Sequence, residues 1–188
     1  MRPRQRPYRA LPTLWLMTDE RVAEDRLIRG AGRLPRGSGI ILRHHALPES
    51  ARRALFDTLR RIAVRRGLIL FVAGPVAQAA AWGASGSHGG RGIRRRGRDR
   101  PLPFSMAVHD MRQLWAARRA GADLVFISPL FATRSHPGSR PLGAGRFAAL
   151  ARRADVPVMA LGGVAPRHGR LIRALGASGF GAIDAFTR

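Results

Sequence analysis

The chain lacks three residue types altogether, because its 188 residues include no cysteine, no lysine and no asparagine. Without cysteine, disulfides, thiol nucleophiles and thiolate metal sites are excluded. Without lysine, Schiff-base chemistry and a lysine phosphate clamp are excluded as well. Lysine and asparagine share A-rich codons, so their joint absence beside abundant arginine indicates a GC-rich genome.

Acidic residues are scarce, since 11 aspartates and glutamates face 34 arginines and the formal net charge is +23. Such a charge favours anionic partners. Codon usage accounts for part of it, however, so the charge alone does not identify the partner.

Long hydrophobic runs are also absent, and none approaches the roughly 20 residues of a membrane span. The first ten residues carry four arginines, but Asp19 and Glu20 follow where an apolar signal segment would stand. We therefore expect a cytoplasmic protein with no membrane partner and a basic, disordered tail over residues 1–11. Residues 12–188 form one domain, and an apolar content of 45% is enough for its core.

Apolar runs of β type alternate with helical repeats along this domain. The predicted strands are residues 12–17, 39–42, 68–72, 84–87, 104–108, 124–127, 156–161 and 179–183. The predicted helices are residues 22–33, 48–66, 76–82, 111–120, 145–153 and 167–175. We expect the three tryptophans, Trp15, Trp82 and Trp115, to be core residues because each lies within a predicted element.

Eight strands alternating with helices predict an α/β fold, a small (β/α)8 TIM barrel. Wholly apolar runs such as residues 68–72 suit parallel strands buried on both faces. Typical barrels have about 250 residues, and this chain stops soon after its eighth strand, so we expect the final helix to be short or missing. A doubly wound open sheet is the alternative.

In a barrel the site lies at the carboxyl ends of the strands. Gly162 and Gly163 follow the seventh predicted strand, where barrels commonly bind phosphate through backbone N–H groups. A plain tight turn is the competing interpretation. Asp184, after the eighth strand, argues against phosphate because a carboxylate repels it.

The segment after the sixth predicted strand, residues 128–138, is the most distinctive in the chain. Thr133 and Ser135 offer hydroxyl donors, and Arg134 offers a planar fork suited to phosphate or carboxylate. We predict that these three residues bind substrate phosphate together with Gly162 and Gly163. A solvated loop is the alternative.

These motifs resemble the thiamine phosphate synthase/TenI family. The resemblance rests on Ile-Ser-Pro-Leu-Phe-Ala-Thr-Arg-Ser-His-Pro-Gly at 127–138, Pro-Leu-Gly at 141–143, Ala-Leu-Gly-Gly-Val at 160–164 and Gly-Ala-Ser-Gly at 176–179. Arg43 and the segment 82–88 stand upstream in the expected order. The resemblance implies a small barrel that couples hydroxymethylpyrimidine pyrophosphate to thiazole phosphate, with Mg²⁺ assisting the loss of pyrophosphate.

Several family positions carry other residues here. Of a Gln-x-Arg-x-Lys pattern on the second strand only Arg43 remains, and an Asn-Asp pair after the third strand is replaced by Ala73 and Gly74. The expected carboxylate a few residues beyond His88 is missing, so the Mg²⁺ implied by the family lacks its ligands and we assign no metal-binding residue. The catalytic candidates are Arg43 and His136, which stands where a lysine is expected.

Histidines also stand at several predicted strand ends. His44 and His45 are adjacent, so at most one of them faces the barrel axis. His88, His109 and His136 follow other strands and could serve as hydrogen-bond partners or proton shuttles, although no metal-binding spacing accompanies them. In the TenI branch a histidine after the sixth strand matters, and Pro129 occupies that place here.

The favoured hypothesis is a thiamine phosphate synthase-like protein whose partner is a phosphorylated small molecule, thiazole phosphate or pyrimidine pyrophosphate. The first alternative is a non-catalytic phosphate-ligand binding or regulatory protein. RNA is the less favoured partner: residues 89–100 hold six arginines, but no RNA-binding motif or aromatic platform accompanies them. A homo-oligomer stays open.

Overall fold

The computed structural model describes residues 11–89, 102–133, 138 and 140–187. Its eight strands are β1 Leu14–Met17, β2 Gly39–Leu42, β3 Ile69–Gly74, β4 Gly86–Gly89, β5 Phe104–Val108, β6 Leu124–Ile127, β7 Val158–Ala160 and β8 Gly179–Ala182. Its helices are α1 Glu24–Arg33, α2 Glu49–Arg66, α3 Val76–Trp82, α4 Met111–Ala120, α5 Gly143–Ala151, α6 Gly169–Ala174 and α7 Asp184–Thr187, with a 3-10 turn η1 at Pro166–His168.

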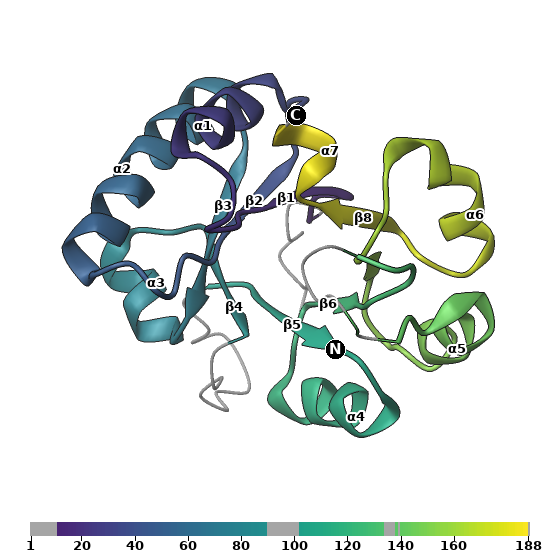
Figure 1. Cartoon of the computed structure of the whole chain (residues 1–188). Helices are drawn as coiled ribbons and strands as arrows, with labels where there is room; N and C mark the ends of the chain where they lie inside the picture. The colour runs from purple at the N-terminus through teal and green to yellow at the C-terminus, as the bar shows by residue number, and fades with distance from the viewer. Residues whose placement is uncertain (1–10, 90–101, 134–137, 139, 188) are drawn as a thin grey trace, which may run out of the picture.

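The strands form a closed barrel in which each pairs in parallel with the next and β8 pairs with β1. The predicted (β/α)8 barrel is thereby confirmed, and the open-sheet alternative is wrong. Helices surround the strands, and the four-residue α7 lies between α1 and α6 as the predicted short final helix (Figure 1). Every helix within the described residues is too short or too polar to span a bilayer.

The barrel interior is filled by aromatic rings that glycines make room for. Trp15 meets Phe71 and Phe126 edge-on, with ring centroids 5.0 and 5.7 Å away. A Cβ on Gly39 would lie 2.2 Å from the Trp15 ring, and one on Gly86 would lie 2.3 Å from the Phe71 ring. Gly39 and Gly86 therefore leave the volume that the Trp15 and Phe71 rings occupy.

Two differences from the predicted elements have clear causes. The seventh strand is shorter than residues 156–161 because Pro157 has no N–H for the ladder, although its carbonyl accepts from Val125 at 3.1 Å.

The expectation that Trp115 is a core residue is wrong. Its side chain is 41% exposed on α4, where the Arg118 guanidinium lies 5.5 Å from the ring centroid.

Candidate functional site

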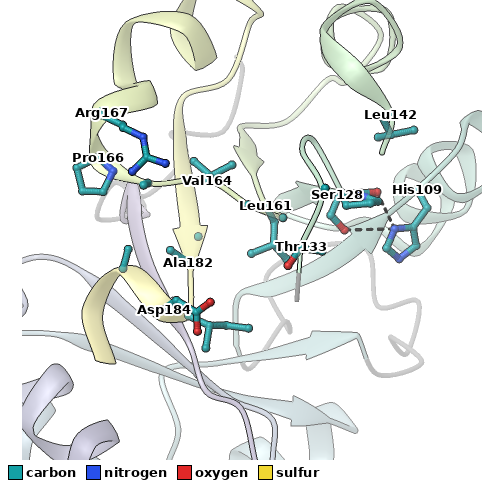
Figure 2. A pocket seen from close by; sticks show the side chains of 18 of the residues that line it. His109, Ser128, Thr133, Leu142, Leu161, Val164, Pro166, Arg167, Ala182 and Asp184 are labelled. Atoms are coloured by element: carbon teal, nitrogen blue, oxygen red, sulfur yellow. Dashed lines mark hydrogen bonds between the residues drawn. The ribbon is translucent and has the colours of Figure 1, made fainter. Parts of the chain in front are cut away.

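A cavity of about 760 Å³ opens at the carboxyl ends of the strands, between the β6, β7 and β8 connections and Arg43. It brings together four of the predicted site residues, Arg43, Thr133, Gly162 and Gly163. The other three, Arg134, Ser135 and His136, lie outside the described residues. Figure 2 shows Thr133 and Leu161 in the centre of this site, with Arg167 on one side and His109 on the other.

The Gly162-Gly163 turn packs closely against the segment that follows β6. Both glycines have positive φ, +89° and +65°, and a Cβ would lie 2.7 Å from the Pro129 Cα at the first and 2.5 Å from the Ala132 oxygen at the second. Leu130 N–H donates to the Leu161 carbonyl at 2.9 Å. The turn thus requires glycine for steric reasons, whatever the cavity binds.

The same turn offers hydrogen-bond donors to the cavity. The amides of Gly163 and Val164 donate to no carbonyl or side chain within the part of the chain that the structure describes. Both residues line the cavity. Two backbone N–H groups are therefore available to an anion there.

Arg167 follows this turn in η1 and also lines the cavity. The loop that carries it is fixed by His168, whose Nδ1 accepts from the Ala165 N–H at 3.1 Å and whose ring centroid lies 4.8 Å from that of Phe131. Arg140 is a further cation of the lining. The sequence did not identify Arg140 and Arg167 as site residues, because the chain has 34 arginines and most of them lie outside the cavity lining. Their positions after β6 and β7 could have identified them, because the loops that follow barrel strands form the site.

Asp184 begins α7 and lines the cavity as well. Its carboxylate lies next to Ala182 in Figure 2, and it would repel a phosphate bound nearby. Three arginines, at 43, 140 and 167, share the lining with this one carboxylate. The electrostatic balance of the cavity still favours an anionic ligand.

Arg43 is held at the cavity by the end of β1. Its terminal nitrogen donates to Asp19 Oδ2 at 2.9 Å, and its Nε donates to the Thr18 carbonyl at 2.7 Å. Asp19 also accepts from Arg21 Nε at 2.8 Å. The hydrogen bond from Arg21, followed by the charges of both arginines, lowers the pKa of Asp19 to about 2. The pKa of Arg43 is lowered by burial, but an arginine stays charged at neutral pH.

Neither member of the adjacent histidine pair enters the cavity lining. His44 is buried with φ of +31°, and its Nδ1 lies 2.8 Å from the Thr18 hydroxyl. His45 is exposed. The Thr18 hydroxyl also accepts from the Arg43 N–H at 2.9 Å, so His44 helps to orient the strand end that carries Arg43.

Two other histidines take different positions at the strand ends. His88 is buried inside the barrel, where its Nδ1 lies 2.9 Å from Ser105 Oγ, and burial followed by the charge of Arg43 lowers its pKa to about 4. His88 is therefore neutral at pH 7. His109 lines the cavity and donates from Nδ1 to the Ser128 carbonyl at 2.7 Å (Figure 2). This bond leaves Nε2 of a neutral His109 as an acceptor.

The described residues offer no site built from side chains alone for a divalent cation. They contain no group of three or more histidine, aspartate or glutamate side chains that could hold a metal ion. Of the carboxylates near the cavity, Asp19 has both oxygens bonded to arginines. Mg²⁺ needs oxygen ligands, usually including carboxylates.

Comparison with known proteins gives a consistent assignment. The family model described as thiamine monophosphate synthase matches residues 14–186. The chain belongs to the thiamine monophosphate synthase family. The resemblance drawn from the motifs is thereby confirmed.

Curated relatives in the thiamine monophosphate synthase family align over nearly the whole chain. A thiamine-phosphate synthase of Roseiflexus castenholzii is 32% identical over 92% of this chain and 79% of its own, and one of Salinispora arenicola is 31% identical over 95% and 90%. The chain spans 43% of an Aquifex aeolicus relative and 32% of the bifunctional protein ThiM/ThiE of Symbiobacterium thermophilum. A solved thiamine phosphate pyrophosphorylase from Pyrococcus furiosus shares the fold, with a TM-score of 0.74 at 21% identity over 93% of this chain and 86% of that chain.

Proposed function

We propose that this protein acts in thiamine biosynthesis as a thiamine phosphate synthase-like protein that binds thiazole phosphate in the cavity of about 760 Å³. The single observation that carries the proposal is the composition of that cavity. Arginines 43, 140 and 167 line a space of the size that small-molecule sites have, together with two backbone N–H groups that have no partner among the described residues.

The phosphate end of the ligand belongs at the Gly162-Gly163 turn in this proposal. The amides of Gly163 and Val164 and the guanidinium of Arg167 supply charge-assisted donors there, and Thr133 adds a hydroxyl from the opposite loop. Leu142 and Leu161 supply apolar contacts for a heterocyclic ring. Asp184 tempers the positive charge and favours a ligand that carries no more than one phosphate at this end.

The coupling reaction assigns a task to Arg43. In that reaction the bond between the pyrimidine methylene carbon and the pyrophosphate oxygen breaks, and the oxygen keeps the electron pair. The thiazole nitrogen then forms the new carbon–nitrogen bond. Arg43, fixed by Asp19 and Thr18, is placed to stabilise the negative charge of the leaving pyrophosphate. His136 and Arg134 remain predicted contributors from outside the described residues.

A second candidate is a binding or regulatory protein that holds the phosphorylated ligand without turning it over. The observation in its favour is that the described residues contain no cluster of carboxylates or histidines that could hold a catalytic metal ion. The two candidates agree on the ligand and differ in turnover. Expectations of a cytoplasmic location and of a homo-oligomer stay predictions.

Calorimetric titration of the full chain with thiazole phosphate tests the proposed function. Wild type is expected to bind with micromolar affinity, and Arg167→Ala is expected to lose about 10- to 100-fold, since hydrogen bonds to charged groups contribute about 1.5–3 kcal/mol each. Arg170→Ala, an exposed arginine on α6 outside the cavity lining, is the matched control and should bind like wild type.

A synthase assay with both substrates then separates the two candidates. Formation of thiamine phosphate supports the coupling enzyme, whereas binding without product supports the second candidate. Absence of thiazole phosphate binding in wild type would contradict both.

A further inference from the structure

A buried arginine lies behind the ends of β2 and β3. Arg52 of α2 is only 8% exposed. Its Nε donates to the Arg43 carbonyl at 3.1 Å, and one terminal nitrogen donates to the Ala73 carbonyl through a short hydrogen bond. The other terminal nitrogen lies 3.3 Å from Gln78 Oε1. All three nitrogens of this guanidinium are thus hydrogen-bonded at the point where the two strands end.

The surroundings of Arg52 keep this cation in place. Its guanidinium carbon lies 5.6 Å from the centroid of the Trp82 ring, a cation–π contact. Burial lowers the pKa of Arg52, and Glu20 and Glu49 raise it, but an arginine remains charged at neutral pH. A fixed positive charge is therefore built into the end of β3, next to the backbone of Arg43.

The end of β3 also excludes a carboxylate side chain. Gly74 has φ of +144°, a conformation that strains any side chain, and a Cβ there would lie 2.9 Å from Gln78 Oε1. Ala73 precedes it with a methyl group inside the barrel. The end of β3 therefore has no side-chain oxygen, and the Ala73 carbonyl there already accepts a hydrogen bond from Arg52.

Asp19, at the end of β1, has its carboxylate oxygens bonded to arginines. Asp19 Oδ1 accepts from Arg21 Nε, and Asp19 Oδ2 accepts from Arg43, both within 2.9 Å. A divalent cation that took Asp19 as a ligand would have to displace these arginines and would then face the charge of Arg52. Like charges at short range repel strongly in a partly buried site.

We propose that the cavity binds its phosphorylated ligands without a divalent cation, and that Arg52, by holding Arg43 and adding its charge at the β3 end, takes the place of a metal there. This inference rests on the proposed function, because it concerns how the same cavity neutralises phosphate. Arg52 is a positioning residue: it does not line the cavity and acts through Arg43.

Titration with inorganic pyrophosphate and with thiazole phosphate, each in EDTA and in excess Mg²⁺, tests the inference on the full chain. We expect both compounds to bind in EDTA, and Mg²⁺ to change neither affinity by more than threefold. A tenfold or larger gain in Mg²⁺ would overturn the metal-free site. Failure of thiazole phosphate to bind in both conditions would instead contradict the proposed function, and pyrophosphate binding in EDTA would still support this inference.

Substitutions of Arg52 test whether its guanidinium and its charge support pyrophosphate binding. Arg52→Gln is expected to lose at least tenfold in pyrophosphate affinity in EDTA, whereas Arg52→Lys, which keeps the charge, should lose less. Arg53→Gln, on the same helix and paired with Asp57, is the control and should bind like wild type. Equal losses in the Gln and Lys variants would show that only the geometry of the guanidinium matters and would overturn the charge argument.

A direct metal titration covers the case in which the Arg52 variants fail to fold. Mn²⁺ added to wild type, followed by electron paramagnetic resonance, is expected to show no saturable binding below millimolar concentration. Saturable micromolar binding of Mn²⁺ would overturn the inference.

Discussion

Replacing Asp19 by asparagine should reduce stability by an amount that depends on pH in a defined way. The pKa of this carboxyl is lowered from 3.8 to about 2, chiefly by the hydrogen bond from Arg21. A shift of this size corresponds to about 2 kcal/mol of folding free energy contributed by the ionised form. Because the folded-state pKa is the lower one, the contribution is complete above pH 4 to 5. It falls as the pH approaches 2, and about half remains at pH 3.

Urea unfolding of wild type and Asp19→Asn at pH 7, 5, 4 and 3 measures this dependence. The difference in unfolding free energy should be about 2 kcal/mol at pH 7 and about half of that at pH 3. Asp25→Asn is the control, since Asp25 pairs with Arg29 on the exposed face of α1 and should change the free energy little at any pH. A difference that stays constant from pH 7 to pH 3 would refute the assignment of the stabilisation to the ionised carboxylate.

Three further predictions concern glycines and the cavity. Gly163→Ala should cost about 2–4 kcal/mol in urea unfolding, from positive-φ strain and a clash with the backbone, and more than Gly37→Ala, which has positive φ but open space. Gly86→Ala should cost about 1–3 kcal/mol by overpacking, and combining it with Phe71→Leu should cost less than the sum of the two single changes. Arg43→Ala should abolish most synthase turnover while leaving thiazole phosphate affinity within about threefold, measured by steady-state assay and calorimetry, because its task is at the leaving pyrophosphate.

Periodicity was sufficient to predict the barrel because most of its strands are apolar on both faces and its longer helices are amphipathic. The run at residues 68–72 became β3, and residues 111–120 became α4 with the same bounds. The error at Trp115 arose because an aromatic residue in a helix indicates burial only when the helix face is known, and its neighbour Arg118 covers the ring at the surface.

A local motif was sufficient to predict the glycine turn of the candidate site. Gly162 and Gly163 stand out because the chain must turn sharply and approach another backbone closely, and a sequence records that need as glycine. Arg167 and Arg52 could not be singled out, because nothing in the local sequence distinguishes them from other arginines. Only the fold reveals that one lines the cavity and that the other holds the ends of β2 and β3.

In the proposed function, the turn after β7 holds the phosphate of a small ligand. A crystal structure of the full chain with thiazole phosphate tests it most directly. We expect phosphate density within hydrogen-bond distance of the Gly163 and Val164 amides, with the Arg167 guanidinium against it. Phosphate density at another strand end, or an empty cavity at a saturating ligand concentration, would contradict it.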